Sequence, residues 1–275
     1  MPDDGGPGAD AGPGAGRTLV GVLGGVGPAA TVLFLERVIR WTDAARDQDH
    51  VDLVVLQHAT VPDRTAFVLG RSADDPGPVL AADARRLAAA GAGFLVLPCN
   101  TAHAFAGAVA AATPVPLLSA VEVAVDAAVG VAVDDGGAPP EAVGLLATEG
   151  TIASGLYADA FAARGVKTLV PDVVGQAAVT SLVYDGVKAG AGGDLRALDG
   201  VIADLRSRGA GAVVLGCTEL PVAARATPPG LLPDVVLVDA LDELARATVL
   251  CAGRRLRGPE TTRSPALAGE RAAVS

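Results

Sequence analysis

Aromatic residues, lysine and long apolar runs are all scarce in this 275-residue sequence. Aromatic side chains make up 3% of the chain, which leaves few platforms on which nucleic-acid bases could stack. The formal net charge is -10, and an acidic surface repels a phosphate backbone. Composition therefore argues against nucleic acid as a partner.

No stretch has the character of a span of about 20 strongly apolar residues, so we expect no membrane span. Mean hydropathy is +0.44, but the surplus comes mostly from alanine and valine. The most apolar long stretch, residues 115–133, is interrupted by Glu122 and Asp126. Residues 1–16 contain acids and no base, unlike a secretory signal. We expect them, and residues 253–275, to be disordered tails.

Cysteine is also rare. Three cysteines are an odd number in a long chain, which argues against a secreted disulfide scaffold. We therefore expect the chain in the cytoplasm, where thiols stay reduced. Hydrophobic residues, at 51% against 19% charged, are sufficient to build a folded core.

The chain between the expected tails contains a loose internal repeat. Similar segments recur 123, 118 and 120 residues apart: GVLGGVGPAAT (21–31) with GLLATEGTIAS (144–154), FLVLPCNTAH (94–103) with AVVLGCTELP (212–221), and VPLLSAVEVAVDAAV (115–129) with VVLVDALDELARATV (235–249). One such pair would be weak support, because strand-turn-helix units look alike. Three pairs at a nearly constant offset predict two similar lobes of about 118 residues.

Short apolar runs alternate with helical segments, which predicts an α/β fold with parallel sheets. Expected strands are 52–56, 94–97, 143–146, 212–215 and 235–238, and expected helices include 81–90 and 198–208. We expect two pseudo-symmetric lobes, each a parallel sheet flanked by helices, with the active site in the cleft between them. The predicted boundaries are a first lobe of 17–118 plus 239–252 and a second lobe of 119–238.

Cys99 and Cys217 occupy matching positions of the repeat, each at the carboxyl end of a predicted strand. If the lobes face each other, both thiols face one cleft, next to helix starts that favour thiolate. A buried structural pair and a redox disulfide are the alternatives. Neither cysteine has CxxC spacing, so we expect no metal. Cys251, in the last predicted helix, has no repeat partner and is expected to be structural.

Two opposed thiols suit the inversion of a carbon centre. One thiolate removes a proton from one face, and one thiol delivers a proton to the other face. The two groups exchange roles for the two directions. This chemistry requires a substrate that binds between the sulfurs with its acidic C–H on the line joining them.

Seven segments together resemble the aspartate racemase branch of the aspartate/glutamate racemase superfamily: GVLGGVGPAAT (21–31), RDQDH (46–50), VPDRTAFVLG (61–70), LPCNTAHAF (97–105), GLLATEGTIASGLY (144–157), YDGVKAG (184–190) and LGCTELP (215–221). The resemblance implies two pseudo-symmetric α/β lobes, no pyridoxal phosphate or other cofactor, and a homodimer. It implies acid/base roles for Cys99 and Cys217. It also implies that Arg64 and Lys188 bind substrate carboxylates.

The remaining candidates lie beside the two cysteines or in the repeated turns. The resemblance assigns Asn100, Thr101 and Ala102 to the substrate-binding loop, and Val26 replaces a methionine that borders the substrate in relatives. The candidates chosen from their own chemistry are Thr148 at a helix start, Thr218 as a hydrogen-bonding residue, and Glu219, which can orient a thiol or the substrate amino group. A phosphate loop at 24–28 is disfavoured, since GGVGPAAT lacks the GK[ST] ending.

The expected function is cofactor-independent interconversion of L- and D-aspartate, with glutamate or related acidic amino acids as further substrates. A maleate-type isomerase, or a racemase of a different acidic substrate, on the same scaffold remains the alternative within the enzyme class. A non-catalytic binder of acidic metabolites is the alternative outside it.

Overall fold

The computed structural model describes residues 17–134, 140–225 and 236–258. The predicted disordered tail at 1–16, and most of the one at 253–275, fall outside these ranges. Across the described ranges, no helix combines the length and the apolar character needed to cross a membrane.

The first lobe is built on a parallel four-stranded sheet of order β2-β1-β3-β4. Its strands are β1 (Val20–Gly24), β2 (Leu53–Gln57), β3 (Phe94–Val96) and β4 (Leu117–Leu118). The second lobe repeats this order as β6-β5-β7-β8, again with every pairing parallel. Its strands are β5 (Ala142–Leu146), β6 (Lys167–Leu169), β7 (Ala210–Leu215) and β8 (Val236–Asp239).

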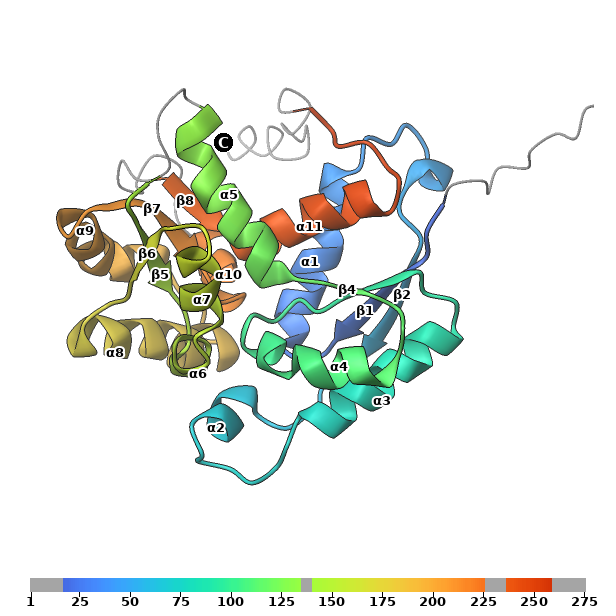
Figure 1. Ribbon diagram of the computed structural model, residues 1–275, viewed down its shortest axis with the longest axis horizontal. Coiled ribbons are helices and arrows are strands. Elements are labelled where there is room, and N and C mark those ends of the chain that lie inside the picture. Colours follow the sequence, from blue (N-terminus) through green and yellow to red (C-terminus); the bar gives the residue numbers. More distant parts are fainter. Residues whose placement is uncertain (1–16, 135–139, 226–235, 259–275) are drawn as a thin grey trace, which may run out of the picture.

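The matching strand orders confirm the predicted fold class of two similar parallel α/β lobes (Figure 1). The apolar runs at 52–56, 94–97, 143–146 and 212–215 all coincide with strands to within about two residues. The unbroken apolar character of these runs follows from burial on both faces, as expected for parallel strands covered by helices.

Helices cover both faces of the first sheet (Figure 1). The helices of this lobe are α1 (Pro28–Trp41), α2 (Arg64–Val68), α3 (Gly77–Ala89), α4 (Ala106–Ala112) and α11 (Ala240–Cys251), with short 3-10 turns η1 (Asp47–Asp49) and η2 (Thr101–Phe105). β1 alternates between the two faces: Val20 and Val22 pack against α1 and α11, and Leu23 packs on the side of α3. Gly21 also faces α3, where a Cβ would lie 2.7 Å from Leu95 and close to Leu87.

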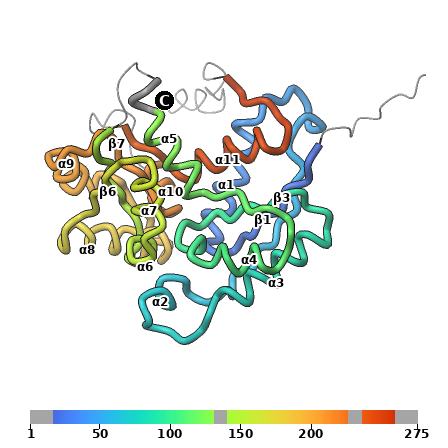
Figure 2. The backbone as a smooth tube through the Cα atoms, in the orientation of Figure 1, coloured from blue at the N-terminus to red at the C-terminus, as the bar shows by residue number. Residues whose placement is uncertain are grey.

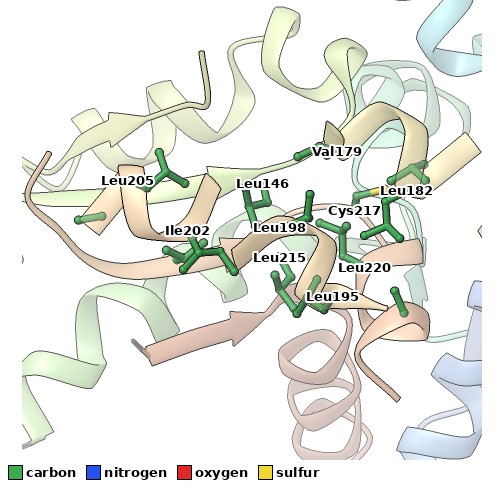
Figure 3. Packing of buried hydrophobic residues seen from close by; sticks show 14 of the residues in the cluster. Leu146, Val179, Leu182, Leu195, Leu198, Ile202, Leu205, Leu215, Cys217 and Leu220 are labelled. Carbon is green, nitrogen blue, oxygen red and sulfur yellow. The ribbon is translucent and has the colours of Figure 1, made fainter. Parts of the chain in front are cut away.

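The second lobe has two core clusters, one on each face of its sheet. Its helices are α5 (Ala120–Asp134), α6 (Glu149–Ala153), α7 (Leu156–Ala162), α8 (Val173–Ser181), η3 (Leu182–Lys188), η4 (Leu195–Leu198), α9 (Asp199–Ser207) and α10 (Glu219–Arg225). One cluster packs leucines of η4 and α9 against β5 and β7, and Cys217 lies at its edge beside Leu220 (Figure 3). The other centres on Tyr157 and Phe161 of α7, which pack with α5.

The chain crosses between lobes twice. It passes from β4 to α5 at Ser119–Ala120, and from β8 to α11 at Asp239–Ala240. The second crossing is held by a half-buried ion cluster, in which Arg37 of α1 lies 2.6 Å from Asp239 and 3.5 Å from Asp242. The predicted lobe boundaries at 118/119 and 238/239 stay predictions, although they fall next to these crossings.

The described chain continues beyond α11 to Gly258 and returns to the end of α1 (Figure 2). The backbone N–H of Asp43 donates to Arg255, Leu256 forms a bridge with Thr42, and Leu256 packs on the first-lobe core. The expectation of disorder from residue 253 is therefore wrong for 253–258. Pairing with residues 42–43 orders this segment, and its polar, arginine-rich sequence did not reveal that partner.

Candidate active site

A pocket between the lobes contains ten of the eleven predicted site residues. Its wall is formed by Val26, Asp63, Arg64, Thr65, Cys99, Asn100, Thr101, Thr148, Lys188, Cys217, Thr218 and Glu219. Ala102 is the exception, because its side chain is fully buried in the first-lobe core and does not line the pocket. Contact between Ala102 and a ligand would have to come from its backbone.

The repeat explains how these residues meet. Cys99 follows β3 and Cys217 follows β7, which are equivalent strands of the two sheets. In the same way Val26 follows β1 and Thr148 follows β5. The carboxyl ends of parallel strands lie at one edge of each sheet, so two facing sheets present all four residues to one space.

Cys217 is held by a local carboxylate. Its side chain is buried, with 4% exposed, and its Sγ–H donates to Oε2 of Glu219 over 3.0 Å. The Thr218 hydroxyl donates to the same oxygen over 3.2 Å. Burial, followed by the charge and hydrogen bond of Glu219, raises the pKa of Cys217 well above its usual range. The neutral thiol is therefore the stable form of this residue, contrary to the sequence-based expectation that a helix start favours thiolate.

Cys99 has a different setting. It is free and also buried, with 8% exposed, and it packs at the edge of the α3 and α4 core. Its backbone carbonyl oxygen forms a hydrogen bond with Nδ1 of His103 over 2.9 Å. No carboxylate within the described ranges hydrogen-bonds to its sulfur, so the two thiols are electrostatically unlike.

Arg64 begins α2 and has an unused guanidinium edge. Its Nη1 donates to the carbonyls of Val61 and Pro62, over 3.2 and 3.0 Å, while its Nε is buried without a hydrogen-bond partner. Within the described ranges it forms no ion pair. A buried donor without a partner is costly, so a ligand oxygen at this position would be favoured.

Lys188 is the second cation of the pocket and lies at the end of η3, a seven-residue π-helix. Its side chain is 31% exposed, its Nζ lies 3.9 Å from Oε1 of Glu219, and it sits 4.5 Å over the ring of Tyr184. Burial acts to lower the pKa of Lys188, but Glu219, Tyr184 and the two pocket cysteines outweigh it and raise the pKa. Lys188 therefore stays charged beside both thiols.

Hydroxyl and amide groups join the lobes beneath the pocket. The Thr101 hydroxyl lies 3.0 Å from that of Thr148 and 2.8 Å from that of Thr151. The Tyr157 hydroxyl donates to Oδ1 of Asn100 over 2.6 Å, and the ring is fully buried in the second lobe. The segment carrying Cys99 therefore belongs to the first sheet but hydrogen-bonds to the second lobe.

Four residues around the pocket were missed by sequence reasoning: Asp63, Thr65, Tyr157 and Tyr184. The chain has only two tyrosines, and both lie here, one on Asn100 and one under Lys188. Their scarcity was the available signal. Asp63 serves locally as the N-cap of α2, since its carboxylate accepts from the backbone N–H of Ala66.

The pocket is nearly closed. Its atoms leave about 10 Å³ for the centre of a water-sized molecule, which is room for about one water. A wider pocket of about 250 Å³ adjoins it through Asp63 and Thr65. At its rim Arg71 of the first lobe lies 2.9 Å from Glu149 of the second lobe. An amino acid therefore enters only if side chains or lobes move.

Neither the remaining histidines nor Cys251 joins the pocket. His58 lies 2.7 Å from Asp83, which also pairs with Arg86. Cys251 ends α11 as expected but is exposed, so it has no packing role in the core. Among the residues described, no cluster of three or more His, Cys, Asp or Glu side chains is arranged to hold a metal ion.

The proteins to which this chain is similar include amino-acid racemases. A family model described as Asp/Glu/Hydantoin racemase matches residues 23–248. The chain is 25% identical over 237 residues to the broad specificity amino-acid racemase RacX of Bacillus subtilis, covering 84% of this chain and 96% of that protein.

Among solved structures, it is similar to the aspartate racemase of Picrophilus torridus, with a TM-score of 0.70 and 26% identity over 87% of this chain and 96% of that one. A putative Asp/Glu racemase from Yersinia pestis, 21% identical, shares the fold with a TM-score of 0.67, and the match covers 86% of this chain and 100% of that one.

Proposed function

The chain belongs to the Asp/Glu/hydantoin racemase family, and we propose that it interconverts L- and D-aspartate without a cofactor, using Cys99 and Cys217 as the two acid/base groups. The observation that carries the proposal is the pairing of two buried thiols with two cations in one pocket. Similarity to the Picrophilus torridus aspartate racemase supports aspartate as the substrate.

The two cations match a substrate with two carboxylates. The guanidinium of Arg64 has a free buried Nε, and Lys188 supplies a compact charge beside both sulfurs. Neutralising the α-carboxylate lowers the energy of the carbanion that forms when the Cα proton leaves. Asn100 and Thr148 supply hydrogen-bonding groups for the remaining polar atoms.

Proton transfer then passes from one face to the other. In one direction the Cys99 thiolate removes the Cα proton, and the Cys217 thiol donates its proton to the opposite face. The carbon gains one proton and loses one, so the charge on the pair of sulfurs moves from Cys99 to Cys217. In the reverse direction the roles are exchanged.

The setting of Cys217 fits the donor role in the first of these directions. Its raised pKa keeps it protonated until a carbanion forms beside it. The charge of Lys188 lowers the energy of the thiolate left behind and so partly offsets burial and Glu219. Without that charge, less of Cys217 would be present as the thiolate that the return step requires.

A broader range of amino acids is the second candidate. Its support is the similarity to a broad specificity racemase, together with the apolar side chain of Val26 in the pocket wall. The adjoining pocket, lined by Ala66, Thr180 and Tyr184, offers space for a longer side chain.

Chiral chromatography of the purified chain with single enantiomers of each amino acid tests the function directly. The proposal predicts racemisation of aspartate without added cofactor, undiminished by hydroxylamine, which traps pyridoxal phosphate. Cys99→Ser and Cys217→Ser should each lower the rate at least a hundredfold, whereas Cys251→Ser, the exposed control, should not. Racemisation at the wild-type rate in both the Cys99→Ser and the Cys217→Ser variant would reject the thiol mechanism. Racemisation of other amino acids but not of aspartate would reject aspartate as the substrate.

A further inference from the structure

His103 is a buried imidazole that the proton transfers proposed above do not use. It lies in η2, four residues after Cys99, and is 4% exposed. Its Nδ1 lies 2.9 Å from the backbone oxygen of Cys99, and its Nε2 lies 3.0 Å from the backbone nitrogen of Ala120. Both ring nitrogens are therefore used by backbone groups, and neither is free to exchange protons with a substrate.

These contacts fix one form of the ring. The amide N–H of Ala120 can only donate, so Nε2 accepts and the proton stays on Nδ1, which donates to Cys99. Burial lowers the pKa of His103, although the carbonyls of Cys99 and Leu118 act in the opposite direction. The ring is therefore neutral at physiological pH and holds its two backbone partners at a fixed separation.

Ala120 gives this link its significance. It is the first residue of α5, at the point where the chain crosses from the first lobe to the second. His103 therefore connects the backbone of a candidate catalytic cysteine to a lobe crossing. The neighbouring bonds from Asn100 to Tyr157 and from Thr101 to Thr148 tie the same short segment to the second lobe.

Cys217 has no histidine in the position that matches His103. The repeat aligns His103 with Pro221, which has no side-chain donor or acceptor. Cys217 is held instead through its sulfur, by Glu219. The crossing at Asp239–Ala240 is held by Arg37, which forms no hydrogen bond with the Cys217 backbone in the part of the chain that the structure describes. Among the described residues, a single side chain links the cysteine to the lobe crossing on the Cys99 side of the repeat and not on the Cys217 side.

We infer that His103 is a positioning residue that makes the location of the Cys99 sulfur depend on the relative orientation of the two lobes. The inference rests on the proposed function, since it concerns the same thiol pair. Proton transfer is steep in distance, and a shift of about 1 Å in a reacting group can cost about a hundredfold in rate. A rigid link to the crossing would place Cys99 correctly only when the lobes are closed on substrate.

Two substitutions of similar size at His103 test its hydrogen bonds to Cys99 and to Ala120 separately. In His103→Asn the amide nitrogen can replace Nδ1 and donate to Cys99, while the bond to Ala120 is lost. In His103→Gln the longer side chain can accept from Ala120, while the bond to Cys99 is lost. His50→Gln is the matched control, because His50 lies in the first lobe away from the pocket.

The informative readout is the deuterium isotope effect on kcat/KM, measured separately with L- and D-aspartate labelled at Cα. Because the two directions share an equilibrium constant of one, kcat/KM must fall equally for both enantiomers, here by roughly ten- to a hundredfold. Displacement of Cys99 alone, in stepwise proton transfer, should raise the isotope effect for the enantiomer it deprotonates. The isotope effect for the other enantiomer should fall, and His50→Gln should change neither.

A second readout does not depend on activity. Alkylation of Cys99 by iodoacetamide, followed by mass spectrometry and normalised to Cys217, should change at least threefold in both His103 variants. Unchanged isotope effects and unchanged relative alkylation in folded variants, with only a lower melting temperature, would reduce His103 to a packing residue and overturn the inference. A wild-type chain that does not racemise aspartate would instead reject the proposed function, and alkylation would still decide the role of His103.

Discussion

The two candidate catalytic thiols sit in unlike surroundings despite their matching places in the repeat. Cys217 donates to Glu219 and has a raised pKa, while the contact specific to Cys99 is made through its backbone. Sequence position predicted both cysteines at strand ends, because apolar runs followed by polar turns mark those ends. It did not predict the raised pKa of Cys217, since burial and a carboxylate two residues away outweigh the nearby helix start.

Glu219→Gln tests this electrostatic account. The neutral amide removes the negative charge that disfavours thiolate, so the pKa of Cys217 should fall. Thiolate absorbance at 240 nm, followed against pH in a background that carries both Cys99→Ser and Cys251→Ser, should show Cys217 ionising at lower pH. Glu219→Asp keeps the charge and should stay closer to wild type. Lys188→Met, which removes a favourable charge, should move the ionisation to higher pH, and a shift in the same direction as Glu219→Gln would contradict the account.

Arg64→Gln tests the carboxylate-binding role of the guanidinium. Loss of a hydrogen-bonded charge costs about 1.5–3 kcal/mol, so kcat/KM for aspartate should fall roughly ten- to a hundredfold. The loss should appear mainly in KM, as measured by initial-rate kinetics with both enantiomers. Arg86→Gln, which alters an exposed cation paired with Asp83 outside the pocket, is the matched control. An equal fall of kcat/KM in the Arg64 and Arg86 variants would show that the fall comes from the change in the net charge of the protein and not from loss of a carboxylate-binding group.

At the scale of elements, short connections after the strands position the pocket residues. The turns after β1, β3, β5 and β7 bring pocket residues to the sheet edges, and the π-helix η3 places Tyr184 and Lys188 together. The sequence predicted these strands well because their apolar runs are distinctive. The π-helix was not predicted, since its wider turn continues directly from α8 and has no distinct sequence period.

Tyr157→Phe tests the link between α7 and the Cys99 segment. The change preserves volume but leaves the buried Oδ1 of Asn100 without its donor, which should cost about 1–3 kcal/mol in the free energy of unfolding. The melting temperature should fall by several degrees, and kcat/KM should fall with it as Asn100 becomes mobile. Differential scanning calorimetry and kinetics measure the two effects. An unchanged melting temperature would show that the hydroxyl contributes nothing to the fold.

At the scale of the whole molecule, the repeat accounts for the architecture and the contacts between lobes account for the site. Three pairs of similar segments sufficed to predict two sheets with equivalent strands. The bonds from Thr101 to Thr148 and from Tyr157 to Asn100 could not be predicted, because they join side chains about 50 residues apart whose proximity depends on how the lobes pack. The predicted homodimer stays a prediction.

Arg71→Gln tests whether the ion pair with Glu149 stabilises the closed pocket. The pair is exposed and spans the two lobes, so it should contribute at most about 1 kcal/mol to closure. We expect KM for aspartate to rise up to about fivefold, with less effect on kcat. Rising ionic strength should raise KM more in wild type than in the variant, because only wild type has this ion pair to screen. Arg46→Gln, whose partner Asp49 lies in the same lobe, is the matched control and should leave KM unchanged.

The most direct test of the central claim, that each thiol serves one face of the substrate, is Cα deuterium exchange in D2O with the single-cysteine variants. Mass spectrometry would follow L- and D-aspartate separately with Cys99→Ser and with Cys217→Ser. The account predicts that each variant exchanges one enantiomer without inverting it, and that the two variants choose opposite enantiomers. Exchange of the same enantiomer by both variants, or inversion by either at the wild-type rate, would contradict the two-thiol account.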